Sequence, residues 1–342
     1  MNNQNNNAPL LIVDDLHKTY SMTVRKGLLR KHYDLKAVDG VSFEVNFGET
    51  VGVVGESGCG KSTLGRTLAR LNEPTSGKVT FDGNDFLELS KEDLRRERKN
   101  IQFIFQDPYS SLDPRMSVEQ IIGEIWRVFP EILPKDKWRR RAQELLELVG
   151  LNAQDLDRYP HQFSGGQRQR IGIARALACE PKLIICDEPV SALDVSIQAQ
   201  VINLFQDIQE RTGVALIFIA HDLSVVRHIA DRTLVMYLGK VVEEGASYEL
   251  FNSPSHPYTQ ALVSAVPMVD PEARVQRQQI DLLGEPPNPI DKPAGCVFRT
   301  RCWQTTDQCS ITEPKLNACG FGRHVACHFP EPKNVLGIHK IE

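Results

Sequence analysis

The chain has 342 residues, of which 41% are hydrophobic and 25% charged, and its formal net charge is −4. This composition is typical of a soluble globular protein with one large domain and a smaller one, and the negative charge disfavours nucleic-acid binding. No apolar run is long enough to span a membrane and the start lacks the features of a secretion signal, so we expect a cytoplasmic chain.

The beginning of the chain is predicted to change from disorder to strand. Residues 1–9 are rich in Asn and poor in apolar side chains, which is typical of a disordered segment. Order is expected to begin with the apolar run 10–13, and the basic stretch 25–31 is interpreted as a charged loop. Tyr20 is placed to stack on a nucleotide base, with Tyr33 as the alternative, although a tyrosine here could instead cover a sheet edge.

A glycine-rich motif follows the predicted strand 51–54 and precedes a predicted helix over 63–70. It has the form G-x-x-x-x-G-K-[ST] and consists of Gly55, Glu56, Ser57, Gly58, Cys59, Gly60, Lys61, Ser62 and Thr63. Glycines let successive backbone N–H groups turn toward a phosphate, and the following helix N-terminus adds partial positive charge. The motif predicts that Lys61 reaches the β- and γ-phosphates of a nucleotide and that Ser62 binds Mg²⁺. An ordinary glycine turn is the alternative, which the flanking strand and helix disfavour.

The next part of the chain alternates between strand and helix signals. Turn residues at 74–77 and the strand 78–81 predict an antiparallel patch. The apolar run 101–105 predicts a buried strand that ends at Gln106. Helical periodicity over about 118–165 predicts a mainly helical insert. Two short basic runs are interpreted as solvated helix faces: 95–99 and 138–141.

A second glycine motif closes the helical insert. It consists of Ser164, Gly165, Gly166 and Gln167, and a helical pattern follows it. Ser164 can cap the helix that begins at the glycines, so free N–H groups and a helix dipole again face an anion. The chain therefore carries two helix starts suited to phosphate.

Two buried strands of the parallel type end in polar residues. The run 183–186 ends in Asp187 and Glu188, and the run 215–220 ends in His221 and Asp222. Open α/β sheets bind their ligands at the carboxyl ends of such strands. Either strand alone would be unremarkable, and it is the order of all these motifs that indicates a nucleotide site.

Taken together, these motifs and the segment 191–194 resemble the ATP-binding-cassette ATPases over about residues 10–252. Phe163 stands where that family commonly has Leu. The resemblance implies an α/β fold, a P-loop ATP-binding-cassette domain with a RecA-like core sheet, an antiparallel β patch and a helical subdomain. It also implies a head-to-tail dimer in which each ATP lies between the phosphate loop of one subunit and the second glycine motif of the other.

The resemblance further implies roles in ATP hydrolysis. Ser62 and Gln106 would ligate Mg²⁺, and Asp187 would hold one of its waters. Glu188 would polarise the attacking water, and His221 would contact the γ-phosphate. The second glycine motif would be the family's signature motif, in which Ser164, Gly165 and Gly166, followed by Gln167, would grip the γ-phosphate of the partner subunit's ATP. Asp194 would report closure across the interface.

The C-terminal part, 253–342, is rich in proline and predicted to be irregular. Its segments 254–262, 284–289 and 295–302 resemble the extension of the oligopeptide and dipeptide importer ATPases, closest to the second ATPase subunit of an oligopeptide permease. This implies a peripheral protein on the cytoplasmic face of the inner membrane. Its partners would be a related second ATPase, two transmembrane permease subunits and an extracytoplasmic solute-binding protein. The alternatives are a nickel or other small-solute importer, a soluble cassette ATPase outside transport, and a non-hydrolysing regulator.

Five of the eight cysteines lie between residues 296 and 327. In a reducing compartment this crowding indicates metal ligation rather than disulfides. The resemblance implies a [4Fe-4S] cluster, with Cys319 free and these ligands: Cys296, Cys302, Cys309 and Cys327. Spacing alone leaves open Zn²⁺, with His324 or His328 in place of a thiolate, and unligated buried thiols.

Overall fold

The computed structural model describes residues 8–26, 29–107, 109–266, 279–282, 284–320 and 322–335. The chain forms two compact units. Unit 1 comprises residues 1–10, 45–50 and 86–219, and unit 2 comprises 11–44, 51–85 and 220–342. Most of the predicted disordered N-terminus lies outside the described residues. Among those described, we find no helix that combines the length and the apolar character needed to cross a bilayer.

Unit 1 contains parallel strands in the order β6-β7-β8. They are β6 (Ile101–Ile104), β7 (Leu183–Asp187) and β8 (Ala215–Ile219). Every residue of β7 and β8 is buried. The prediction of a buried strand at 101–105 is only partly right, since within β6 only Ile101 and Ile104 are buried and Phe105 beyond it is 38% exposed. The reason is that β6 is the last strand in the order and has a neighbour on one side only.

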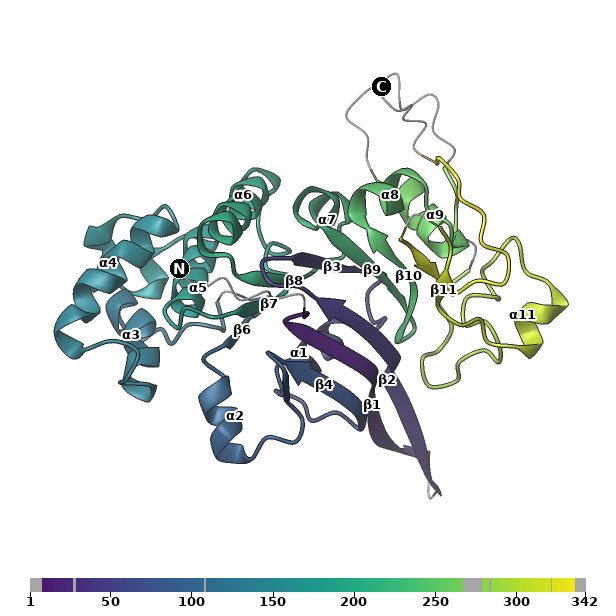
Figure 1. Ribbon diagram of the computed structural model, residues 1–342, viewed down its shortest axis with the longest axis horizontal. Helices are drawn as coiled ribbons and strands as arrows, with labels where there is room; N and C mark the ends of the chain where they lie inside the picture. Colours follow the sequence, from purple (N-terminus) through teal and green to yellow (C-terminus); the bar gives the residue numbers. More distant parts are fainter. Residues whose placement is uncertain are drawn as a thin grey trace. The chain divides into compact units, whose positions relative to one another are not determined.

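The helices of unit 1 include the predicted helical insert. They are α2 (Lys91–Glu97), α3 (Val118–Val128), α4 (Trp138–Leu148), α5 (Gly165–Leu177) and α6 (Val195–Thr212). Both α3 and α4 pack against α5 (Figure 1). Buried Trp126 of α3 also donates a hydrogen bond from Nε1 to the carbonyl oxygen of Ala178, at 2.9 Å. These contacts fix the insert against α5 and the residue that ends this helix.

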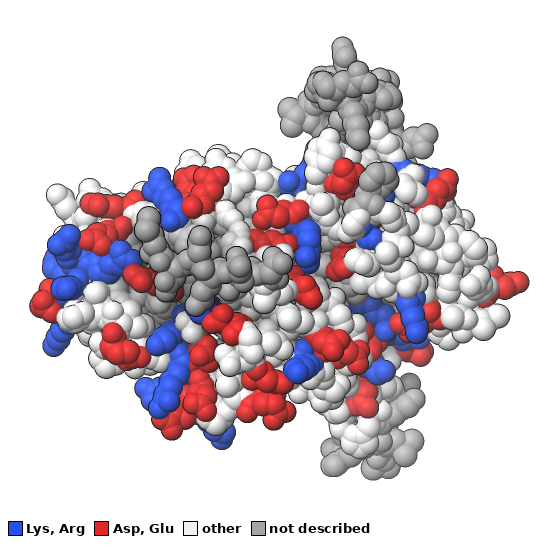
Figure 2. All heavy atoms as spheres, viewed as in Figure 1, with Lys and Arg blue, Asp and Glu red and all other residues white. Residues whose placement is uncertain are grey.

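The two basic runs lie on helix surfaces, as predicted. Arg96 on α2 pairs with Glu92 at 2.7 Å, and Arg139 on α4 pairs with Asp157 at 2.7 Å. Arg140 is 86% exposed. These pairs balance the basic residues locally with acidic ones. Figure 2 shows blue and red side chains interspersed on the face drawn.

Unit 2 contains an antiparallel sheet in the order β2-β1-β4-β5. Its strands are β1 (Leu11–Lys26), β2 (Leu29–Val45), β4 (Ser76–Phe81) and β5 (Asn84–Asp85). The predicted charged loop at 25–31 is wrong for most of its length, because β1 continues through Lys26 and β2 begins at Leu29. Side-chain hydrogen bonds hold this polar hairpin together: Ser21 to Asp34 at 2.7 Å and Thr23 to His32 at 2.9 Å.

A mixed sheet forms the rest of unit 2, in the order β11-β12-β10-β9-β3. Its strands are β3 (Thr50–Val54), β9 (Arg232–Tyr237), β10 (Lys240–Ala246), β11 (Asn317–Ala318) and β12 (His324–Val325). β3 and β9 are parallel, whereas the other pairs are antiparallel. The helices are α1 (Lys61–Leu68), α7 (Leu223–Ile229), α8 (Ser247–Asn252), α9 (Pro257–Ser264) and α11 (Asp307–Ile311). α8 packs on β9 and β10 (Figure 1).

The C-terminal segment joins this sheet through a buried polar contact. The carboxylate of Glu243 on β10 accepts hydrogen bonds from the backbone N–H groups of Ser255 at 2.8 Å and His256 at 2.9 Å. His256 in turn accepts the N–H of Tyr258 at Nδ1, at 3.0 Å. Complete burial lowers the pKa of His256 to about 3, so the ring is neutral at neutral pH. Glu243 therefore fixes where α9 begins.

Candidate nucleotide site and cysteine pocket

The phosphate loop runs from buried strand β3 into α1, and the helix begins at Lys61, two residues earlier than predicted. Glycine is required at both ends of the loop. A Cβ atom on Gly55 would lie 2.2 Å from the carbonyl oxygen of Met236, and one on Gly60 would lie 2.1 Å from that of Ala37. Gly60 also has a φ of 109°. The loop is therefore pressed against β2 and β9.

Lys61 lies inside this loop and is 4% exposed. Its Nζ donates hydrogen bonds to the carbonyl oxygens of Gly55 at 2.7 Å and Glu56 at 3.0 Å. The ammonium is thus held inside the loop, at the start of α1. Its role in binding the β- and γ-phosphates stays a prediction.

Unit 1 brings two predicted site residues into contact at the end of β7. Asp187 is fully buried as the last residue of the strand. Glu188 follows with a φ of 47°, a strained conformation for a residue other than glycine, and its N–H donates to Ile219 at 3.0 Å. The Glu188 carboxylate accepts a hydrogen bond from Nε2 of Gln106 at 3.1 Å. The predicted water-polarising residue and one predicted Mg²⁺ ligand are therefore adjacent.

The second glycine motif begins α5 with a capping box. The Ser164 hydroxyl accepts the N–H of Gln167 at 3.4 Å, and the Gln167 amide oxygen accepts the N–H of Ser164 at 3.0 Å. A Cβ on Gly166 would lie 2.5 Å from the Ile197 side chain of α6. The predicted cap is confirmed, and Gly166 is also needed for helix packing.

The remaining predicted site residues lie on other elements of the chain. Asp194 is the N-cap residue of α6, but its side chain makes no capping hydrogen bond. Tyr20 lies on β1, where its hydroxyl accepts a hydrogen bond from Asn72 at 2.9 Å and the amine of Lys18 lies 4.9 Å from its ring centroid. His221 follows β8 and belongs to unit 2. The choice between Tyr20 and its alternative Tyr33 on β2 stays a prediction.

The four cysteines predicted as ligands line one pocket of unit 2. Two histidines, His256 and His328, also line it, whereas Cys319 and His324 do not. The complete lining is His256, Pro257, Cys296, Phe298, Arg299, Cys302, Gln304, Cys309, Cys327, His328 and Phe329. Within the described ranges, however, no three His, Cys, Asp or Glu side chains are arranged to hold a metal ion.

Three thiols of this pocket are disfavoured as thiolates. Burial raises the pKa of Cys296, Cys302 and Cys327, the last to about 11, and the neighbouring thiols raise each of them further. The His324 ring pairs with Glu244 at 2.9 Å. That residue is thus engaged elsewhere, which disfavours it as a substitute ligand.

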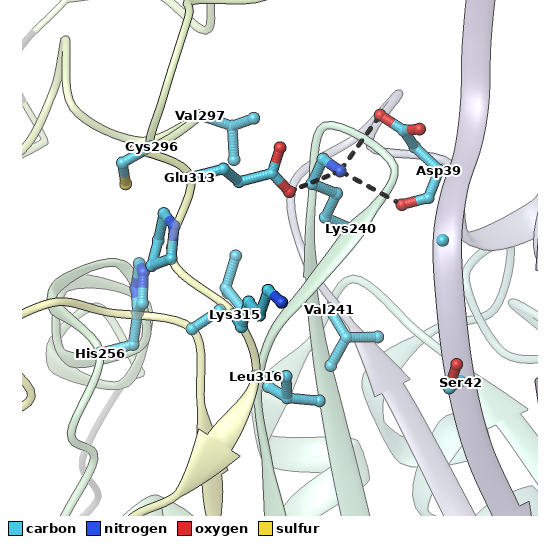
Figure 3. A pocket seen from close by; sticks show the side chains of 14 residues that line it. Asp39, Ser42, Lys240, Val241, His256, Cys296, Val297, Glu313, Lys315 and Leu316 are labelled. Atoms are coloured by element: carbon cyan, nitrogen blue, oxygen red, sulfur yellow. Dashed lines mark hydrogen bonds and ion pairs between the residues drawn. The ribbon is translucent and has the colours of Figure 1, made fainter. Parts of the chain in front are cut away.

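A larger cavity of about 580 Å³ lies between β2, β10 and the C-terminal segment. Figure 3 shows the Lys240 amine bridging its two sides, at 2.8 Å from Glu313 and 3.3 Å from Asp39. Lys292 also pairs with Asp39, at 3.2 Å. Burial acts to raise the pKa of Asp39, but these lysines outweigh it and the pKa is lowered. Local sequence patterns give no signal for this cluster, because its members are far apart in the chain.

Family comparisons agree with this geometry. The ABC transporter family model matches residues 38–191, and the model of the oligopeptide/dipeptide transporter C-terminal region matches residues 242–309. The dipeptide transport ATP-binding protein DppF of Haemophilus influenzae is 49% identical to this chain, over 94% of this chain and 97% of its own length. This chain belongs to the ABC transporter ATP-binding proteins of the oligopeptide/dipeptide type. Another relative, the oligopeptide transport ATP-binding protein AppF of Bacillus subtilis, is 52% identical over 94% of this chain and 98% of its own length.

Solved structures of ABC cassettes resemble this ABC ATPase in fold. A dimeric ATP-binding cassette in a post-hydrolysis state, bound to ADP and phosphate, has 29% identity and a TM-score of 0.60 and covers 69% of this chain and 98% of its own. The cbiO1 protein of Clostridium perfringens, part of the cbiONQ transporter complex, has 30% identity and a TM-score of 0.60 and covers 71% and 90%. The predicted α/β cassette fold with an antiparallel β subdomain is confirmed. So is the predicted activity: this ABC ATPase is the ATP-binding subunit of a peptide importer and hydrolyses ATP for transport.

Proposed function

We propose that this ABC ATPase works in a heteromeric pair with a second, related ATPase. The pair would drive two transmembrane permease subunits from the cytoplasmic face of the inner membrane, with solute delivered by an extracytoplasmic binding protein. Oligopeptides or dipeptides are the proposed cargo. The main support for this proposal is the match of residues 242–309 to the C-terminal region of oligopeptide/dipeptide transporters. It favours peptides over nickel or another small solute, and it disfavours a cassette ATPase outside transport.

We propose the following division of labour in the nucleotide site. The phosphate loop of unit 2, Gly55 to Thr63, surrounds the ATP phosphates, with Lys61 neutralising charge on the β- and γ-phosphates. The adenine is proposed to stack on Tyr20. Mg²⁺, when bound, neutralises phosphate oxygen charge, and the residues proposed to hold it are Ser62, Gln106 and, through a water, Asp187.

Glu188 is the proposed base that polarises the attacking water. The Gln106 amide beside it supports this role, because a donated hydrogen bond orients the carboxylate. His221 is proposed to contact the γ-phosphate. The signature residues Ser164 to Gln167 are proposed to bind the partner's ATP, and their place at the N-terminus of α5 supports this. Asp194 is proposed to report closure across the dimer interface.

We also propose two domains, an ABC domain over 10–252 with a helical insert at about 118–165, and a C-terminal domain over 253–342. The family models support this division, since they match separate stretches of the chain. The end of α8 at Asn252 is consistent with a boundary there.

Reconstitution tests the transport proposal. The chain, its second ATPase and both permease subunits in proteoliposomes should show ATP turnover that rises severalfold with peptide-loaded binding protein, because cargo delivery closes the cassette dimer. The same assay with nickel should give no stimulation. Full transport by a homodimer of this chain alone would overturn the heteromeric pair, and stimulation by nickel rather than peptide would overturn the cargo.

We propose further that Cys296, Cys302, Cys309 and Cys327 hold a [4Fe-4S] cluster, with Cys319 free. The four side chains lining one pocket provide the all-thiolate donor set that such a cluster needs. When bound, the cluster supplies a rigid cross-link between these four positions. Metal binding also stabilises thiolates, which offsets the raised thiol pKa values of this pocket. Zn²⁺ is the alternative occupant.

Anaerobically purified protein is expected to be brown and to contain about four irons per chain. Cys327→Ser should lose the colour and the iron, because it removes one of the four ligands, and should still bind ATP. Cys319→Ser is the matched control and should keep both. Colourless protein with stoichiometric zinc would refute the cluster, and bleaching in Cys319→Ser would refute the ligand set.

A further inference from the structure

Glu56 is the second residue of the phosphate loop, and its N–H, carbonyl and carboxylate groups each form hydrogen bonds with other residues of unit 2. Its N–H donates to the Tyr258 hydroxyl at 2.8 Å. Its carbonyl oxygen accepts from Lys61 at 3.0 Å. Its carboxylate accepts two hydrogen bonds from the Arg301 guanidinium, Nη1 to Oε2 at 2.8 Å and Nη2 to Oε1 at 3.1 Å. The phosphate loop is therefore attached to the C-terminal segment at two points.

Both contacts are partly buried, on the side of Tyr258 and Arg301, and the Glu56 side chain is 25% exposed. Tyr258 is fully buried, and Arg301 is 8% exposed. A two-point contact between guanidinium and carboxylate fixes orientation as well as distance. Burial acts against the charged form of Arg301, but the hydrogen bonds and charge of Glu56 outweigh it and raise the pKa of Arg301. Losing the Glu56 carboxylate would leave the buried Arg301 charge without this partner.

The surrounding packing holds Tyr258 and Arg301 in place. The Tyr258 ring lies 4.7 Å from that of Tyr237 on β9 and 5.4 Å from that of Phe298, measured between centroids. The backbone N–H of Arg301 donates to the carbonyl oxygen of Phe298 at 3.0 Å. One aromatic cluster thus anchors both residues, and Cys302 of the cysteine pocket follows Arg301 directly in the chain.

We propose that Tyr258 and Arg301 are positioning residues of the nucleotide site, which hold Glu56 and, through its carbonyl group, the Lys61 ammonium in the geometry that binds ATP. This inference rests on the proposed role of Lys61 in phosphate binding. It assigns the C-terminal segment a function inside the ATPase itself, because ATP affinity then depends on residues far beyond the cassette motifs.

Arg301→Gln and Tyr258→Phe test the proposal, and Tyr258→Phe keeps the packed ring while removing only the hydroxyl. Each should raise the Kd and KM for ATP by roughly tenfold, the scale of one lost charge-assisted or buried hydrogen bond, and leave kcat within about twofold. Lys333→Gln is the control for charge, since it removes one positive charge from an exposed pair with Glu331. It should bind ATP like the unchanged protein.

The double variant Glu56→Gln with Arg301→Gln separates positioning from a general loss of structure. Because both partners of the ion pair are then uncharged, its ATP Kd should lie closer to the unchanged protein than that of Arg301→Gln alone. Unchanged Kd in both single variants, or strictly additive effects in the double variant, would overturn the proposal. Lys61→Ala tests the proposed nucleotide site separately. Normal ATP binding in Lys61→Ala would contradict the role of Lys61 and, with it, the positioning proposal.

Discussion

Glu188→Gln is expected to lower steady-state ATP turnover by about 10²- to 10⁴-fold while ATP binding persists. The amide keeps the shape of the side chain at the end of β7 but cannot polarise the attacking water. Phosphate release under single-turnover conditions measures the loss, and size-exclusion chromatography with ATP should show an accumulated ATP-bound dimer.

Glu210→Gln on α6 is the matched control, because it is the same change at an exposed position. Its turnover should equal that of the unchanged protein. If Glu188→Gln also turned over at that rate, Glu188 would not be the base, and the Gln106 contact would have to be interpreted as structural.

Lys61→Ala is expected to weaken ATP binding by about 100-fold or more, because it removes the cation that the loop holds against the phosphates. Titration with a fluorescent ATP analogue measures the dissociation constant directly. The close approaches of Gly55 to Met236 and of Gly60 to Ala37 do not involve the Lys61 side chain, so the variant should fold.

Lys78→Ala on β4 is the control, since its amine pairs only loosely with Asp85, at 3.8 Å, and is 61% exposed. It should bind ATP normally. An unchanged dissociation constant in Lys61→Ala would rule out the assignment of Gly55–Thr63 as the phosphate-binding loop.

These expectations depend on features that are encoded locally. A glycine-rich turn between a buried strand and a helix leaves the first N–H groups of the helix unpaired, wherever the fold places it. Ser164 and Gln167 are three residues apart, so their capping box depends on that spacing alone. For this reason the phosphate loop and the signature helix could be predicted from short motifs.

Contacts between distant residues could not be predicted in this way. Residue type alone predicts a charged loop at 25–31 and a buried strand at 101–105. The structure of these segments is instead decided by the cross-strand pairing of β1 with β2 and by the terminal place of β6 in its strand order. The crowding of five cysteines between residues 296 and 327 predicts metal ligation. Only the folded segment puts four of these thiols around one pocket and leaves Cys319 outside it.

The sequence by itself determined the family, the nucleotide motifs and the order of their strands and helices, because each depends on residues close together in the chain. Only the tertiary structure decided that Arg301 and Tyr258 hold Glu56, across separations of 245 and 202 residues. The residue types carry no signal for such a pairing, since an arginine or a buried tyrosine has many potential partners. The choice among them follows from how β9, α9 and the C-terminal segment pack around the phosphate loop.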